Sequence, residues 1–127
     1  MEKQFIESSK APKAIGGYAQ AVTLEGAKKI VFVSGQIPVD RDGKIPEGFA
    51  DQARLAWRNL EAQLEAAGMG LANLVKVTIF LSDRRYGLDN RKVRQEMLGE
   101  RSPALTVIIT GIFDEAWLLE IEGIAAA

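Results

Sequence analysis

The chain has 127 residues and a formal net charge of −1, so it has the length of one domain (residues 1–127) and no basic surplus for nucleic acid or an anionic membrane. It contains no cysteine and no histidine, which excludes disulfides, thiolate chemistry, a Ser-His-Asp triad and histidine metal ligands. Acid–base chemistry is therefore left to Glu, Asp, Lys, Tyr or water. No signal peptide is evident and no apolar run approaches ~20 residues, so a cytoplasmic protein is expected.

In chain order, short apolar and β-branched runs predict strands, and two longer runs with apolar residues every three or four positions predict helices. The strands are expected at 3–7, 18–25, 29–34, 74–81, 102–108 and 119–125, and the helices at 49–67 and 89–98. The turn at 25–28 predicts a hairpin of the second and third strands. The unbroken apolar run at 30–33 predicts that the third strand is buried on both faces.

The first helix has the strongest signal, because its apolar residues form one stripe and a glycine, Gly68, follows its end. The stripe consists of Phe49, Ala53, Ala56, Leu60, Leu64 and Ala67. In the second helix we expect Asp89 at the N-cap, with Asn90 and Val93 on the inner face.

The last strand alternates apolar and acidic residues. Leu119 and Ile121 point to one face, and Glu120 and Glu122 point to the other. An edge strand with one solvated face explains this pattern, and so does a carboxylate that works in a site. We expect Glu122 to pair with Lys76 across the sheet, which leaves Glu120 as the candidate for chemistry.

The order β-β-β-α-β-α-β-β predicts an α+β fold in which both helices cover one face of a mixed sheet. The other face would place Lys76, Thr78 and Glu120 among apolar residues such as Phe80 and Ile124. Such a face is too apolar to be simply solvated and too polar to be a core. Self-association through this face is therefore expected.

Five stretches of the chain together resemble the YjgF/RidA family, also called L-PSP endoribonuclease or reactive intermediate/imine deaminase. They are AIGGYAQA at 14–21, VSGQIP at 33–38, KVTIFLSD at 76–83, SPA at 102–104 and EIEGIA at 120–125. The resemblance implies a chorismate-mutase-like α+β subunit. It also implies a homotrimer whose sheets form a central barrel, with a small-molecule site at each subunit interface.

For the deaminases of this family, the resemblance implies hydrolysis of enamines or imines such as 2-aminoacrylate to a 2-keto acid and ammonia, without a cofactor. Glu120 matches the glutamate that positions the attacking water, and Tyr18 matches the pocket tyrosine. The implied substrate-binding positions are Ser34, Gly35, Asn90, Leu105 and Val107. Tyr18 also fits an ordinary strand aromatic, and Asn90 a helix cap or interior hydrogen bonder.

Leu105 departs from the family pattern, because the active deaminases have an arginine at this position. That arginine holds the substrate carboxylate with two charged hydrogen bonds of about 1.5–3 kcal/mol each, so its loss predicts activity on 2-aminoacrylate at least about a hundredfold weaker. Arg101 lies roughly 13 Å away along an extended chain. Four other arginines remain open as replacements: Arg84, Arg85, Arg91 and Arg94.

Three functions are consistent with these residues. A RidA-like hydrolase is slightly favoured, because the resemblance covers nearly the whole chain. A non-catalytic small-ligand-binding or regulatory trimer follows next, because Leu105 cannot hold a carboxylate. The endoribonuclease of the family name is least favoured, since the chain has no histidine pair and no basic surplus to bind phosphates.

Overall fold

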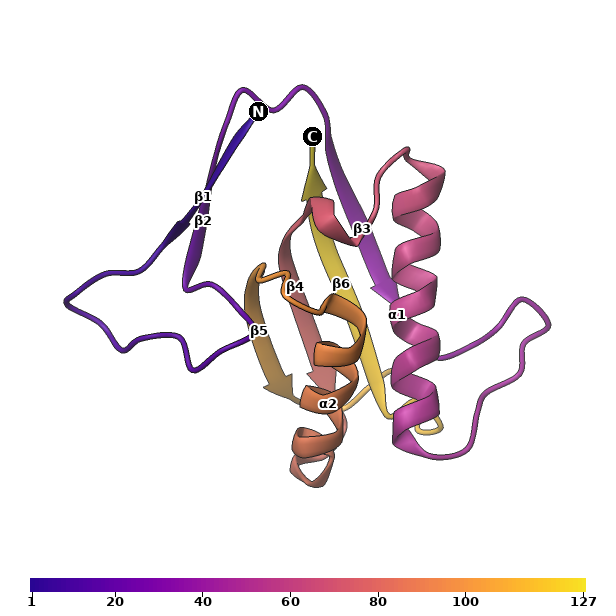
Figure 1. Cartoon of the computed structure of the whole chain (residues 1–127). Helices are drawn as coiled ribbons and strands as arrows, with labels where there is room; N and C mark the ends of the chain where they lie inside the picture. The colour runs from indigo at the N-terminus through magenta and orange to yellow at the C-terminus, as the bar shows by residue number, and fades with distance from the viewer.

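The computed structural model describes all residues, 1–127, as six strands, two helices and two short 3₁₀ turns (Figure 1). The strands are β1 (Glu2–Ile6), β2 (Ala21–Glu25), β3 (Ile30–Gln36), β4 (Leu74–Leu81), β5 (Ala104–Ile109) and β6 (Leu119–Ala126). The helices are α1 (Phe49–Ala66) and α2 (Gly87–Leu98), and the turns are Leu71–Asn73 and Arg84–Tyr86. The order of elements is the predicted one.

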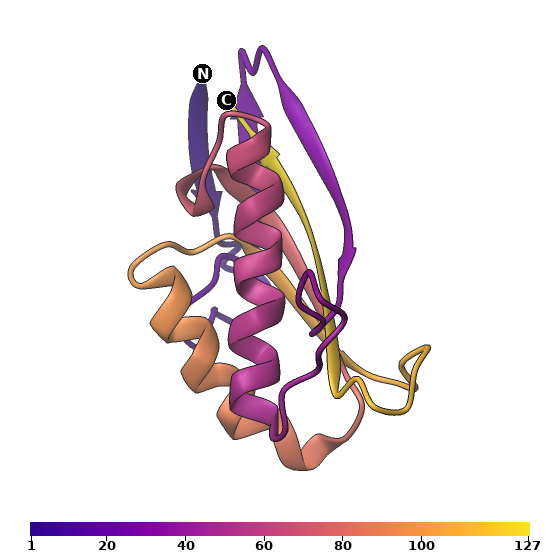
Figure 2. The same ribbon diagram turned by 90° about the vertical axis from the view of Figure 1, so that its right-hand side faces the viewer.

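Four strands form the main sheet in the order β3-β6-β4-β5, and both helices cover one of its faces (Figures 1 and 2). β4 and β5 run parallel and are joined through α2, as parallel neighbours require a crossover connection. β6 is antiparallel to both of its neighbours, β3 and β4. The prediction of a mixed sheet with two helices on one face is confirmed.

β1 and β2 form a separate two-stranded sheet, so the predicted hairpin of β2 and β3 was wrong. β1 is the strand that hydrogen-bonds to β2, and the chain just before β2 is tied to β5. There, Ala19 N donates to Pro103 O at 3.0 Å. The small sheet stands on the β5 side of the main sheet, away from β3 (Figure 1). The expected single sheet is therefore divided in two.

β3 lies at an edge of the main sheet and is open on one face, whereas the sequence predicted burial on both. Val33 is buried, but Phe32 is 75% exposed and Ile30 is 51% exposed. A continuous apolar run is buried on both faces only when layers cover both sides of the sheet, and here the helices cover one side. The opposite face remains open and partly apolar.

α1 supplies much of the core through the predicted stripe. Its buried residues are Phe49, Gln52, Ala53, Ala56, Trp57, Leu60 and Leu64, and they pack on inward-facing residues of β4 and β6 such as Ile79 and Ile121. Of the predicted stripe, Ala67 alone is partly exposed. The helix ends just before Gly68, whose φ of +80° turns the chain away from the helix axis. Met69 N then donates to Leu64 O at 2.8 Å.

α2 begins at Gly87, two residues before the predicted N-cap, so that prediction was wrong. Asp83 caps the preceding 3₁₀ turn instead, because its carboxylate accepts a hydrogen bond from Arg85 N at 2.8 Å. Asp89 lies in the first turn of α2, where a negative charge is favourable. Asn90 and Val93 are buried on the inner face, as predicted.

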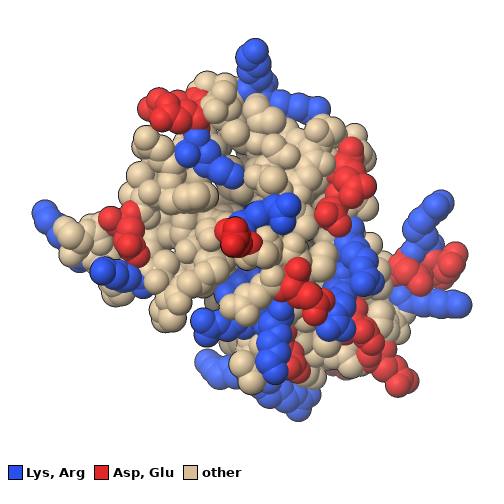
Figure 3. Space-filling model, in the orientation of Figure 1, with Lys and Arg blue, Asp and Glu red and all other residues tan.

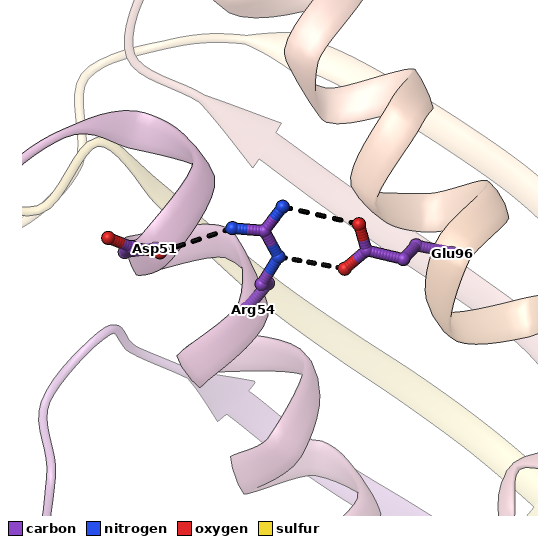
Figure 4. A network of polar contacts seen from close by, with 3 residues as sticks. All are labelled: Asp51, Arg54 and Glu96. Atoms are coloured by element: carbon purple, nitrogen blue, oxygen red, sulfur yellow. Dashed lines mark hydrogen bonds and ion pairs between the residues drawn. The ribbon is translucent and has the colours of Figure 1, made fainter.

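An ion-pair network joins the two helices (Figure 4). Arg54 of α1 donates to Glu96 of α2 through Nε at 2.7 Å and Nη2 at 3.2 Å, and its Nη1 reaches Asp51 at 3.1 Å. The hydrogen bonds from Arg54 lower the pKa of Glu96 below its ordinary value. This two-pronged contact links the exposed sides of α1 and α2.

We expect Leu60→Ala to lower the free energy of unfolding by about 2–5 kcal/mol, because Leu60 is fully buried and its removal leaves a cavity. The matched control is Leu88→Ala on α2, where the side chain is 66% exposed and the loss should stay near ~0.5 kcal/mol. Urea denaturation of the three proteins provides the measurement. Equal losses at the two sites would contradict the assigned core.

We expect Glu96→Gln to reduce stability near neutral pH and to have little effect in acid. A carboxyl group whose folded pKa is lowered contributes stability above its unfolded pKa, and this contribution disappears as the pH falls through the folded pKa. Urea midpoints at about pH 7 and about pH 3 test this. Glu65→Gln serves as control, because Glu65 forms no ion pair. A deficit of equal size at both pH values would exclude the ionic origin.

Candidate functional site

The alternation of β6 divides the candidate residues between the two faces of the main sheet. Leu119 and Ile121 are fully buried under the helices, so Glu120 and Glu122 point to the opposite face. Residues that pair on neighbouring strands lie on the same face of the sheet. Glu120 lies opposite Phe80 of β4, and Phe80 lies opposite Ile108 of β5. We call this side of the sheet, opposite the helices, the open face.

Glu120 lies against the backbone of β3. A Cβ atom added at Gly35 would overlap Glu120 Oε2, so glycine is the residue that lets the carboxylate lie across the strand at this point. The pairing of β3 with β6 is irregular here, between Val33 and Gln36, and Ser34 is exposed beside it. Glu120, Gly35 and Ser34 form one group, which we call the Glu120 group.

Glu122 does not form the predicted ion pair with Lys76. It is exposed and lies opposite Thr78 in the strand register, whereas Lys76 lies opposite Ile124. Lys76 Nζ instead donates to Thr106 Oγ1 on β5 at 2.6 Å. The prediction failed because it needed the register between β4 and β6, which alternation alone does not supply.

A second group surrounds a cavity of about 320 Å³ on the helix side of β5. Its lining comes from the loop before β2, the end of β4, the turn before α2, α2 itself and β5. The lining residues are Ile15, Gly16, Tyr18, Leu81, Arg84, Gly87, Asn90, Arg91, Arg94, Val107 and Ile109. We call it the α2–β5 cavity.

Tyr18 reaches the α2–β5 cavity from the loop at 15–18. Its hydroxyl oxygen accepts a hydrogen bond from Ile15 N at 3.3 Å, so the O–H proton stays free for another acceptor. Gly16 and Gly17 have φ values of +125° and +74°, which allow the chain to turn there and bring the tyrosine back over the cavity. Tyr18 is half-buried and does not belong to a strand.

Asn90 and Val107 line the same cavity, whereas Leu105 does not. Asn90 is 3% exposed in the interior of α2, and its Oδ1 has no hydrogen-bond partner. It is therefore neither a cap nor a fully satisfied interior residue. Val107 is exposed toward the cavity from β5. Leu105 is half-buried and packs against the apolar core.

The seven predicted site residues do not converge within one chain. Val107 pairs in register with Ile79, which pairs with Ile121, and this row faces the helices. Glu120 belongs to the alternate row on the open face. A ligand that touches both Tyr18 and Glu120 therefore requires the cavity of one copy to meet the Glu120 group of another.

Arg94 is a site residue that the sequence did not single out from the other arginines. It lies on α2 one turn after Asn90 and is 6% exposed, and its Nε has no hydrogen-bond partner. Burial lowers the pKa of Arg94, the charge of Arg91 lowers it further, and Tyr18 opposes both. The spacing of four from Asn90 was the available signal, because it places both side chains on one helix face.

The site shows no arrangement suited to a metal, and no group of three or more acidic side chains is placed to hold one. None of the helices is both long and apolar enough to cross a membrane. Basic side chains gather over the lower part of the face in Figure 3, where Figure 1 places α2, with acidic side chains between them. The charge of this region is thus mixed at the surface, and the cavity itself is lined by arginines alone among charged residues.

Comparison with known proteins connects this geometry to a family. The model described as "Endoribonuclease L-PSP" matches residues 8–127. A RutC family protein of Pyrococcus horikoshii is 38% identical over 125 residues, covering 97% of each chain. The rat 2-iminobutanoate/2-iminopropanoate deaminase is 36% identical over 126 residues, covering 97% of this chain and 89% of the relative. The crystal structure of Escherichia coli TdcF with bound serine superposes with a TM-score of 0.74 at 36% identity, covering 98% of each chain. The chain therefore belongs to the L-PSP endoribonuclease family, that is, the YjgF/RidA family of reactive intermediate deaminases.

Proposed function

We propose that this chain is a RidA-like hydrolase that deaminates small enamines or imines in a cleft between two copies, without a cofactor. The observation that carries the proposal is the Glu120 carboxylate held against Gly35, on a strand whose neighbouring side chains form the core. The names of relatives, such as the rat 2-iminobutanoate/2-iminopropanoate deaminase, support the same reaction class.

The reaction needs one water molecule and a series of proton transfers. Protonation of the enamine at carbon gives the iminium, and water then attacks the iminium carbon while Glu120 accepts a proton from it. The resulting carbinolamine receives that proton on nitrogen, and its C–N bond breaks as the carbonyl forms. The hydroxyl proton passes through Glu120 to the departing ammonia, which leaves as ammonium. Iminium and water thus become keto acid and ammonium, without an oxidant or a metal. Tyr18, whose O–H proton is free, would donate a hydrogen bond to the ligand.

The proposal includes weak activity on 2-aminoacrylate. Leu105 supplies neither charge nor donor, and it lies against the apolar core and outside the α2–β5 cavity. Transfer of a carboxylate from water into a cleft is unfavourable unless a cation receives it, and position 105 supplies none. The same observation favours the second candidate, a small-ligand-binding or regulatory trimer that retains the cleft without turnover. A ribonuclease is not proposed, because the chain lacks histidine and has a net charge of −1.

The proposed assembly is a homotrimer in which neighbouring copies cover each open face, with the β5 edge of one copy toward the Glu120 group of the next. The open face carries exposed apolar residues, Ile30, Phe32 and Ile108, beside the Glu120 group. Exposed apolar area of this kind is typical of a surface that is covered in the assembled protein. Contact between copies through this face would also bring a second chain toward Glu120.

We expect sedimentation equilibrium at micromolar concentration to give the mass of a trimer for the wild type and a lower mass for Phe32→Glu. A carboxylate in place of this 75% exposed phenylalanine cannot be desolvated without a partner. Leu88→Glu is the matched control, since Leu88 is exposed on α2 and should leave the mass unchanged. A monomer mass for the wild type would contradict the shared cleft.

We expect keto-acid formation from enzymatically generated 2-aminoacrylate to be at least about a hundredfold slower than in an arginine-bearing relative, and to rise in Leu105→Arg.

Glu120→Gln should lower the rate on 2-aminoacrylate or 2-iminobutanoate by roughly a hundredfold or more, both in the wild type and in Leu105→Arg. Glu122→Gln, one carboxylate along the same strand, is the control and should retain the rate. Full activity of Glu120→Gln would refute the assigned role. No turnover in any variant would favour the ligand-binding trimer.

A further inference from the structure

We propose that Arg94 is the anion receptor of this chain, and that the ligand binds with its carboxylate against α2 and its carbon chain toward β5. The proposal deepens the proposed function, on which it rests for the reacting end of the ligand. It assigns a specificity-determining residue of that site, the one that receives the carboxylate of the ligand. The evidence is the burial of Arg94, its lack of partners and the composition of the α2–β5 cavity.

The first step is the state of the Arg94 side chain. It is 6% exposed, no carboxylate lies within ion-pair distance of it, and its Nε donates to nothing. A buried guanidinium is unfavourable unless it is paired and hydrogen-bonded. The chain itself supplies no such partner for Arg94, so an anionic ligand would stabilise it. Arg54, in contrast, has two carboxylate partners at the surface.

The second step is the place of Arg94 beside the cavity. Arg94 and Asn90 are one helical turn apart, and both line the cavity. Asn90 is 3% exposed and has an unpartnered side-chain oxygen, so two buried and unsatisfied polar groups meet at one wall. A Cβ at Gly17 would lie 3.5 Å from Arg94 Nη2, which places the guanidinium directly under the loop that carries Tyr18.

The third step is the sign of the charge around the cavity. Arg84 and Arg91 line it together with Arg94, and none of the eleven lining residues is acidic. Three guanidinium groups around one depression attract an anion and repel a cation. Because the guanidinium is planar and presents paired N–H groups, a carboxylate matches it with two parallel hydrogen bonds.

The fourth step is the apolar part of the cavity. Leu81, Val107 and Ile109 line the strand side, and Ile15 lines the loop side. These residues offer no hydrogen bonds and favour an aliphatic chain over a sugar or an inorganic anion. The ligand chemistry that fits both walls is a short aliphatic carboxylic acid.

The positive charge of the cavity comes from α2 and the turn before it. Leu105 packs on the core and is not part of the cavity lining, so the positive charge is supplied from α2 and not from this β5 position. A carboxylate held by α2 approaches the cleft from another side than one held at position 105.

The test is isothermal titration of the intact protein with 2-oxobutanoate, the keto acid corresponding to 2-iminobutanoate, with 2-oxobutanamide as its neutral counterpart. We expect Arg94→Met to weaken 2-oxobutanoate binding at least about tenfold, the loss of one charged contact, and Arg94→Lys to weaken it less. Arg85→Met is the matched control, because Arg85 lies outside the cavity and should bind as the wild type does. The neutral amide should bind weakly and equally to the wild type and to Arg94→Met.

A second pair of variants tests the same point without removing Arg94. Val107 is 40% exposed at the cavity, so Val107→Asp places a carboxylate there to compete with the ligand, whereas Val107→Asn has the same size without charge. We expect at least about tenfold weaker 2-oxobutanoate binding in Val107→Asp than in Val107→Asn. This comparison remains informative if Arg94→Met does not fold.

Two results would overturn the proposal: unchanged binding of 2-oxobutanoate in folded Arg94→Met, or inorganic phosphate that binds as tightly as 2-oxobutanoate and depends equally on Arg94. Because binding is measured with an acid that does not react, it is separate from turnover. A wild type that binds 2-oxobutanoate through Arg94 and deaminates nothing would refute the hydrolase and retain this receptor. Deamination by the wild type together with 2-oxobutanoate binding that does not depend on Arg94 would support the hydrolase and refute the receptor.

Discussion

The alternation of β6 is the constraint on which the fold and the site both depend. Because Leu119 and Ile121 are fully buried beneath α1, the strand has one permitted register relative to the helices, and a slip by one residue would bury two carboxylates. The same requirement holds Glu120 on the open face, where Gly35 leaves room for it. Core packing on one face thus positions the candidate catalytic group on the other.

This constraint also explains why the site is divided. The α2–β5 cavity lies on the helix side of the sheet and the Glu120 group on the other, and the sheet itself separates them. In one chain, no side chain of ordinary length reaches across a packed sheet between those groups. In the site proposed above, ligand binding is therefore linked to association of copies, so a change that weakens association is expected to weaken binding.

The sequence predicted those features that follow from local periodicity, and it failed where distant pairing decides. The stripe of α1 and the alternation of Glu120 with Ile121 are visible in single segments, and both are confirmed. The separation of β2 from β3 was missed, because the two segments fit a hairpin locally while β1 and β5 hold β2 elsewhere. The burial of Arg94 was missed for a similar reason. It arises from a glycine-containing loop more than seventy residues earlier, and no local pattern on α2 reports that loop.

Leu105 and Arg94 assign apolar packing and positive charge to two different elements. Position 105 lies in register with Val77, whose side chain is fully buried, so an arginine there must extend its stem past the core to reach a ligand. Leucine at 105 has no charged end that must reach past the core, and it adds to apolar packing. The guanidinium of Arg94 extends from the helix that forms the cavity wall, and its charge need not pass the core. The stability of the subunit and the recognition of an acid are then supplied by different elements, so each can change with less effect on the other.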